Sequence, residues 1–191
     1  MKHIERRRFL LAALAAGPLA ACAGGAPPAS APPAPRGRAG ILVRGGRDRL
    51  GTPRRVFGGL RVDAKVHPGD SGGDLYVVEH SDEAKGGPPR HVHHEQDEWF
   101  YVLEGSYRLE VGDERFELGP GDSVFAPRRV PHVWAHTGDG VGRLIIAFQP
   151  AGRMEPFLAA LTGAGSSPSP DELRPLFSAH GMTVVGPPLP V

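Results

Sequence analysis

The chain of 191 residues has only one cysteine, almost no net charge and no long apolar run. A single cysteine excludes an internal disulfide framework and a zinc site built from several thiolates. The formal net charge of +1 argues against a protein that binds DNA or RNA. No apolar stretch reaches the roughly 18 residues of a membrane-spanning helix, which excludes a protein with several such helices. The length suits one domain of ordinary size.

Residues 1–21 are typical of an export signal. A basic start precedes a short apolar run and a small-residue segment, which is the layout of a secretory signal peptide. Residues 6–10 (RRRFL) resemble the twin-arginine pattern R-R-x-F-L, and residues 19–22 (LAAC) resemble the lipobox of bacterial lipoproteins. We therefore expect cleavage before Cys22, a lipid on that cysteine and a location on the periplasmic side of a bacterial membrane. A generic basic signal with cleavage nearby is the alternative.

Removal of residues 1–21 takes away four basic residues and one acidic residue, which leaves a formal net charge of −2. The mature chain therefore has no electrostatic case for binding nucleic acid. Residues 22–40 are nearly all Ala, Gly and Pro and have no periodic apolar pattern. Such a segment cannot bury enough surface to fold, so we expect a disordered tether. The lipid on Cys22 would then be the only contact with a membrane.

Residues 41–150 consist of short apolar segments separated by turn residues. Alternation of apolar and polar residues predicts strands, at 74–80, 98–104, 106–112, 115–118, 123–126, 133–136 and 143–149. No helical pattern separates these strands, which favours a sandwich or a barrel over a parallel sheet. The expected fold class is therefore all-β.

Residues 151–191 change to a helical period. Apolar residues recur at i, i+3, i+4 and i+7 within 154–161 and again within 173–180. Ser169 is a candidate N-cap for the second helix, with Pro170 at its first position and a glutamate completing the capping box. We expect two C-terminal helices whose apolar faces pack on the outside of the β domain.

A cluster of histidines contains the candidate metal ligands. In a strand, His91 and His93 point to the same face, and a bend after them can present Glu98 beside both. His132 is the natural fourth member, drawn from a distant segment. Three imidazoles and one carboxylate suit a first-row divalent ion and leave positions open for a substrate or O2. Iron, manganese, nickel, cobalt, copper and zinc all accept this set.

The remaining histidines are assigned weaker roles. His94 points opposite to its neighbours, so we expect it to be exposed or to support a ligand. His136 lies on the same strand face as His132 and is a candidate supporting residue. His67, His80 and His180 have no partner in the sequence and are interpreted as structural or solvated. A surface histidine cluster without function is the alternative to the whole metal site.

At these residues the chain resembles the cupin family. One cupin pattern, G-x5-H-x-H-x3,4-E-x6-G, matches from His91 to Gly105 with an offset leading glycine. The second, G-x5-P-x-G-x2-H-x3-N, matches from Gly121 through His132. Arg129 stands where that pattern has glycine, and His136 stands where it has asparagine. The resemblance covers about residues 55–150 and implies a single jelly-roll β-barrel.

The sequence around the first motif, PPRHVHHEQDEWFYVLEG, is similar to that of single-domain cupins grouped with quercetin 2,3-dioxygenases. This resemblance implies a metal-dependent dioxygenase that acts on a small phenolic or enolic molecule, with Glu98 as both ligand and base. Phe100, Val102, Phe125 and Trp134 either line an apolar pocket or belong to the core. A non-catalytic ligand-binding cupin and a metal-dependent isomerase or lyase are the alternatives. The family also implies a homodimer formed through the sheets.

Overall fold

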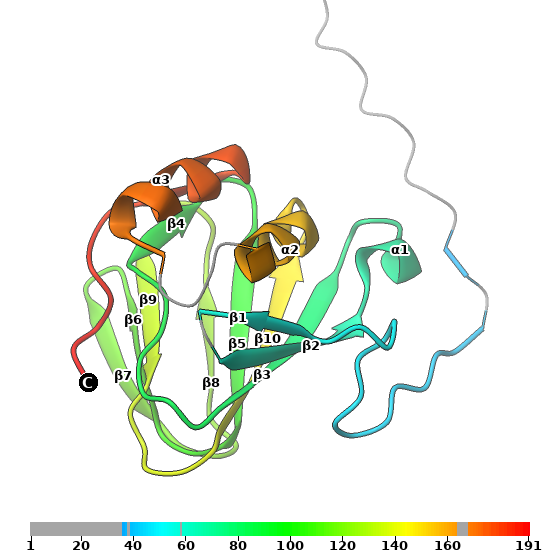
Figure 1. Ribbon diagram of the computed structural model, residues 1–191, viewed down its shortest axis with the longest axis horizontal. Helices are drawn as coiled ribbons and strands as arrows, with labels where there is room; N and C mark the ends of the chain where they lie inside the picture. Colours follow the sequence, from blue (N-terminus) through cyan, green and yellow to red (C-terminus); the bar gives the residue numbers. More distant parts are fainter. Residues whose placement is uncertain (1–35, 38, 58, 164–167) are drawn as a thin grey trace, which may run out of the picture. The chain divides into compact units, whose positions relative to one another are not determined.

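The computed structural model describes residues 36–37, 39–57, 59–163 and 168–191, and the expected signal peptide and most of the expected tether lie outside these residues. The strands of the described residues form two antiparallel sheets (Figure 1). Neighbours in the first sheet are, in order, β1 (Arg54–Val56), β2 (Leu60–Val66), β3 (Tyr76–Asp82), β10 (Gly142–Gln149), β5 (Asp97–Glu104) and β8 (Ser123–Ala126). In the second sheet they are β11 (Met182–Val184), β4 (His91–His93), β9 (His132–His136), β6 (Tyr107–Val111) and β7 (Glu114–Leu118).

The core lies between the two sheets and follows from strand alternation. In β10, Leu144, Ile146 and Phe148 are buried while the residues between them are partly exposed. Their neighbours on β5 share the same face, because Leu144 pairs with Val102 and Ile146 pairs with Phe100. Side chains that alternate along a strand point to opposite faces, so these two strands present one continuous apolar face to the interior. The predicted all-β fold is confirmed.

The described residues also form three helices, namely α1 (Pro68–Ser71), α2 (Met154–Gly163) and α3 (Pro170–Ala179). The capping box predicted for the last helix is present: the Ser169 side chain accepts from the Glu172 amide, and the Glu172 carboxylate accepts from the Ser169 amide. Gly181 follows that helix with a φ of 82°, a left-handed conformation that glycine adopts without strain. No helix of the described residues is both long enough and apolar enough to cross a membrane.

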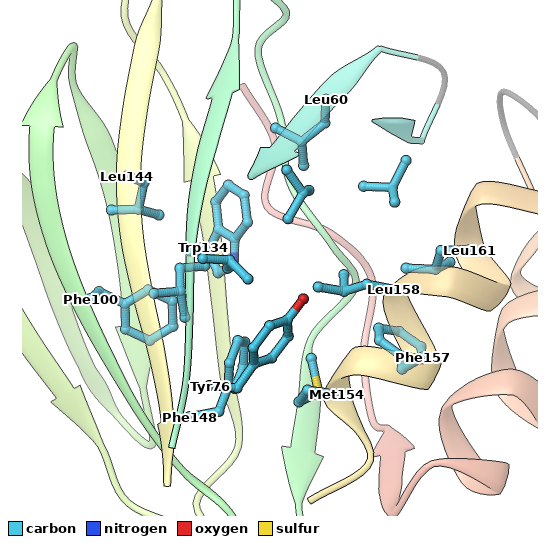
Figure 2. Close-up of a cluster of buried hydrophobic side chains, with 14 of the residues drawn as sticks. Leu60, Tyr76, Phe100, Trp134, Leu144, Phe148, Met154, Phe157, Leu158 and Leu161 are labelled. Carbon is cyan, nitrogen blue, oxygen red and sulfur yellow. The ribbon is translucent and has the colours of Figure 1, made fainter. Parts of the chain in front are cut away.

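Helix α2 packs its apolar face against the β domain and contributes to the core. Its side chains Met154, Phe157, Leu158 and Leu161 are buried and face the interior of the sandwich, toward Trp134 and Phe148 (Figure 2). Phe177 on α3 stacks edge-on against Phe157, with ring centroids 4.8 Å apart. An ion pair between Arg54 and Glu155 ties α2 to β1. The helices therefore complete the core, since the two sheets alone leave one side of it open.

Three strands, β1, β2 and β11, are absent from the sequence-based prediction. β1 and β2 form a hairpin in which Arg54 pairs with Val62 and Val56 with Leu60. β11 is only three residues long and pairs with β4, so that Met182 lies opposite His93 and Val184 opposite His91. This pairing places the C-terminal segment directly beside the histidine-bearing strand.

Candidate metal centre

The first sheet supplies one member of the predicted cluster. Glu98 lies on β5, where Glu98, Phe100 and Val102 are the buried, inward-facing residues of the alternating pattern. Glu98 pairs with Ala126 of β8 on one side and with Phe148 of β10 on the other. A carboxylate therefore occupies an inward-facing strand position, where an apolar residue is usual. Burial of a charge in this position is costly unless a partner of opposite charge or a metal ion compensates it.

The second sheet supplies the three histidines. His91 and His93 are the two buried residues of β4, and His132 begins β9. His91 and His132 are direct cross-strand partners, and their ring centroids lie 4.6 Å apart. The His93 and His132 rings are nearly parallel, with an interplanar angle of 10° and centroids 5.4 Å apart. The pairing of β4 with β9 thus brings together residues from two distant segments of the chain.

Across the sandwich, the four residues converge on one small volume. One donor atom from each of His91, His93, Glu98 and His132 lies within 4.8 Å of all the others. Glu98 Oε2 lies 2.8 Å from His132 Nε2 and 3.2 Å from His93 Nε2. None of the four side chains is more than 5% exposed. The structure therefore brings together all four residues that the sequence predicts as ligands.

Each of the three imidazoles directs its Nδ1 atom to an acceptor outside the cluster. His91 Nδ1 lies 2.8 Å from the carbonyl oxygen of Pro89. His132 Nδ1 lies 3.2 Å from the carbonyl oxygen of Val130. His93 Nδ1 lies 3.2 Å from Gln96 Oε1, while the amide nitrogen of Gln96 donates to two backbone carbonyls, those of Pro150 and Ala151. All three partner atoms are acceptors, so the Nδ1 atoms are the donors.

This assignment leaves the three Nε2 lone pairs available to the cluster. His93 Nε2 has no hydrogen-bond partner within the part of the chain that the structure describes, although the Glu98 carboxylate is close. Lone pairs and a carboxylate directed at one another repel, and a cation between them removes the repulsion. A histidine ligand typically donates its second nitrogen to a carbonyl or carboxylate, as these rings do. The donor set therefore suits a single divalent metal ion.

Electrostatics keep the cluster in the form that binds a cation. Burial alone would raise the pKa of Glu98, but the neighbouring His132 and His93 rings hold this pKa well below its usual range. Burial, and next the neighbouring His132 and His93, lower the pKa of His91 well below its ordinary value. At neutral pH the carboxyl group is therefore ionised and the His91 ring is neutral, which is the state that a metal requires.

An ion pair between Asp97 and Arg128 links the strand that carries Glu98 to the turn that leads to His132. Asp97, which precedes Glu98, accepts from the Arg128 backbone nitrogen at 2.9 Å and from the Arg128 guanidinium at 2.6 and 3.0 Å. The hydrogen bonds from Arg128 lower the pKa of the Asp97 carboxyl, so the pair stays charged at neutral pH. Because Arg128 belongs to the turn that leads to His132, this bidentate contact joins the turn to the strand of Glu98.

Arg129 stands where the cupin pattern has glycine, and its backbone adopts the conformation that a glycine would take. Arg129 adopts a φ of 68°, the left-handed conformation that a glycine would take there. Its backbone nitrogen donates to the His93 carbonyl oxygen at 2.7 Å, and its guanidinium donates to the His94 carbonyl oxygen at 3.2 Å. These hydrogen bonds offset the strain of a non-glycine residue in this conformation and attach the turn to β4.

The other histidines lie outside the four-residue cluster. His136 is buried on β9 and contacts the Tyr107 ring, with centroids 5.2 Å apart, so it does not contribute a ligand atom. His94 is exposed, as predicted, and its Nε2 lies 2.9 Å from Thr183 Oγ1. His67 caps α1, and His180 Nδ1 contacts the Leu176 carbonyl oxygen. Gln96, which orients His93, was missed because no spacing rule marks it.

An apolar cavity of about 40 Å³ adjoins the cluster, and His91 and Glu98 form part of its wall. This volume has room for roughly three water molecules. Trp134 lines the cavity, whereas Phe100 and Val102 are plain core residues with no exposed surface. Phe125 is 58% exposed, so its predicted place in a pocket is wrong. It pairs with Trp99 on the outer face of β5, because the inward position beside it belongs to Ala126.

His80, interpreted from the sequence as structural or solvated, is a buried residue. It lies on β3, on the same inward face as Tyr76 and Val78, and is 7% exposed. Its ring packs edge-on against Trp134, with centroids 5.4 Å apart, and it lines the same cavity as His91 and Glu98. Of the two interpretations given for His80, structural or solvated, burial excludes the solvated one, and the alternation with Tyr76 and Val78 is the signal that places it inward.

A jelly-roll sandwich with three inward histidines and a glutamate defines the cupin class of proteins. Residues 77–148 match the family model for the cupin domain, Cupin_2. This segment runs from β3 through β10 and contains all four cluster residues. Residues 77–148 are therefore a cupin domain, and the fold of the chain is the cupin fold.

A curated relative described as an uncharacterized protein of Methanocaldococcus jannaschii is 33% identical over 49 residues, which are 26% of this chain and 39% of the relative. The chain thus spans about two fifths of the length of this relative. A solved structure of a predicted oxalate decarboxylase from Thermotoga maritima has a TM-score of 0.52 and 15% identity, and the match covers 58% of this chain and 99% of that one. This likeness shows the fold alone.

Two further solved structures are similar over part of the chain. An RmlC-like cupin from Shewanella frigidimarina is 25% identical with a TM-score of 0.46, over 59% of this chain and 93% of the other. KdgF from Halomonas sp. is 27% identical with a TM-score of 0.41, over 48% of this chain and 78% of the other.

Replacement of Gln96 tests whether this amide positions His93. In Gln96→Ala the His93 ring loses its Nδ1 acceptor, and we expect the affinity for a divalent metal to fall about ten- to a hundredfold. Competition with a chromophoric chelator measures this affinity. Glu95→Ala, at the exposed neighbouring position, serves as the control and should bind as the unchanged protein does. A folded Gln96→Ala protein with unchanged affinity would show that the amide has no such role.

The pH dependence of stability tests the burial of His80. Burial lowers the pKa of His80 from 6.5 to about 4. Below pH 6.5 the unfolded chain therefore binds a proton that the folded chain does not, so stability falls as the pH drops to about 4. This group contributes about 3 kcal/mol to that loss. Urea unfolding of the metal-free protein between pH 7 and pH 4 should show a shallower loss in His80→Phe, and identical slopes would contradict the argument.

Proposed function

We propose that the protein is a metal-dependent dioxygenase, similar to quercetinases, that acts on a small phenolic or enolic molecule. The observation that carries the proposal is the convergence of three imidazole lone pairs and one carboxylate at the wall of an apolar cavity. Three imidazoles and a carboxylate would hold one divalent ion and leave coordination positions open. His91, His93, Glu98 and His132 are the proposed ligands.

A divalent ion held by these residues would lower the pKa of a coordinated hydroxyl group, and the deprotonated oxygen would be more electron-rich than the hydroxyl. The protein's own groups prepare that step. Glu98 is the one anionic group of the cavity wall, so its Oε atoms are the proposed acceptors of a proton from a substrate hydroxyl. The resemblance to quercetinases supports the same role.

The remaining wall of the cavity excludes water. Met154, Phe157 and Leu158 of α2 and Ile146 and Phe148 of β10 surround the polar end of the cavity with apolar groups. An electron-rich substrate held in such a wall is shielded from bulk solvent, and electrostatic contacts within it are stronger than in water. The small volume favours a compact, largely apolar ligand over a charged or extended one.

Oxygen uptake by the purified full-length protein tests the proposed reaction. Protein loaded separately with iron, manganese, nickel, cobalt, copper or zinc is mixed with quercetin, catechol or pentane-2,4-dione in an oxygen electrode. We expect one metal per chain and oxygen consumption with at least one pair of metal and substrate. Glu98→Gln and His132→Asn should lower that rate at least about a hundredfold, while the exposed control His94→Asn should leave it unchanged.

Other outcomes identify the alternatives. A protein that retains one metal per chain but consumes no oxygen with any of the three substrates is not the proposed dioxygenase. Conversion of substrate without oxygen would then indicate an isomerase or lyase, and binding without conversion would indicate a ligand-binding cupin. If Glu98→Gln and His132→Asn both keep their metal, the four residues do not form the proposed metal centre.

We also propose export through the twin-arginine route and lipid anchoring at Cys22, on the sequence alone, because residues 1–35 lie outside the described part of the chain. Growth with a labelled fatty acid tests the anchor. The unchanged chain should incorporate the label and Cys22→Ser should not, because an oxygen atom replaces the sulfur that carries the lipid. Replacement of the paired arginines by lysines is the matched test of the route. Equal labelling with and without Cys22 would contradict the anchor.

A further inference from the structure

His80 is a buried histidine for which the fold provides no polar partner. Neither ring nitrogen has a hydrogen-bond partner in the described part of the chain. The other buried histidines each direct Nδ1 to an oxygen atom, of Pro89, Gln96, Val130 or Ala84. Buried polar groups are usually paired, and each exception calls for an explanation. The surroundings of His80 give none in terms of folding, because its ring packs on Trp134 and faces the apolar cavity.

The strand position itself does not require a polar residue. Val62 of β2 and Leu144 of β10 are the cross-strand partners of His80, and both are buried. An apolar side chain of similar size would fill the site without leaving two nitrogens unpaired, and such replacements are often neutral or stabilising. A histidine at this place therefore weakens the fold, which is common for residues that act on a ligand.

The cavity places His80 and the cluster on one shared wall. His80, His91 and Glu98 are its polar lining residues, and the other lining groups are almost all apolar. His80 is not a member of the group whose donor atoms lie within 4.8 Å of one another, so it does not share the ion. Burial keeps the ring neutral at pH 7 against the opposing charge of Glu98. A neutral imidazole offers one donor and one acceptor to a ligand.

We propose that His80 is a positioning residue that forms a hydrogen bond with a second polar group of the substrate while the metal centre binds the first. The substrate class that follows is a compact, largely apolar molecule with two hydroxyl or carbonyl groups. These groups are too far apart for both to coordinate the same ion. This inference rests on the proposed metal centre. It adds the requirement that the substrate has a second polar group, which the metal centre alone does not impose.

Phenol and resorcinol are matched probes for this requirement. Each has one hydroxyl for the metal, and resorcinol has a second hydroxyl that its ring geometry keeps away from the same ion. The full-length protein is loaded with zinc, which has no redox chemistry, so that binding is measured without turnover. Equilibrium dialysis gives the two affinities, and elemental analysis gives the metal content of each protein.

The unchanged protein should bind resorcinol about tenfold more tightly than phenol, which is the effect of one buried hydrogen bond. In His80→Phe that preference should disappear, while the affinity for phenol and the zinc content stay the same. His80→Gln keeps a donor and an acceptor and should restore part of the preference. The melting temperature of His80→Phe should be unchanged or a few degrees higher, whereas a purely structural histidine would give a lower one.

A second variant separates cavity size from recognition. Met154→Ala widens the cavity without changing a polar group, so the same two probes are titrated into Met154→Ala with His80 present and with His80→Phe. If neither the unchanged protein nor Met154→Ala prefers resorcinol, or if the preference survives in His80→Phe, the role of His80 is overturned. A chain that binds no zinc but still shows a preference that depends on His80 would overturn the metal centre and leave the role of His80 standing.

Discussion

The mutual repulsion of four electron-donating groups in a dry interior is the constraint on which this structure depends. Three imidazole nitrogens and a carboxylate lie within 4.8 Å of one another, where water cannot screen them. Glu98 comes from one sheet and the histidines come from the other, so the packing of the two sheets sets the size of the cluster. A divalent ion turns the same arrangement from repulsive to attractive, and for this reason metal binding and stability of the sandwich interior are coupled.

The histidine rings are oriented by two kinds of contact, one local in the sequence and one distant. His91 and His132 each contact the carbonyl oxygen two residues earlier in the chain, so their rings are held by the local backbone. His93 depends on Gln96, whose amide nitrogen is bound by the backbone at residues 150 and 151. The segment that leads into α2 therefore reaches the metal centre through a single amide. A change in how that segment packs would be transmitted to one ligand and not to the other two.

Much of the fold and cluster was predictable, because the strands from β5 to β10 alternate clearly and both histidine motifs have fixed spacings. Strand β11 was not, since three residues carry no periodicity and its only support is pairing with β4. Phe125 was misassigned because alternation gives two faces without saying which is inward; its pairing with Trp99 decides this. The sequence left His80 as structural or solvated, because a polar residue within a strand can face either way; its inward position on β3 decides between the two.

The helix α2 has a consequence for function that the two sheets would not produce alone. Met154, Phe157, Leu158 and Leu161, whose side chains face the core (Figure 2), line the cavity of about 40 Å³ beside the cluster. Most of the side chains that line this cavity are apolar, and Met154 among them is unbranched and adaptable in shape. A strongly hydrated or multiply charged molecule would lose its water there without compensation. An apolar lining of this kind therefore favours uncharged ligands over charged ones.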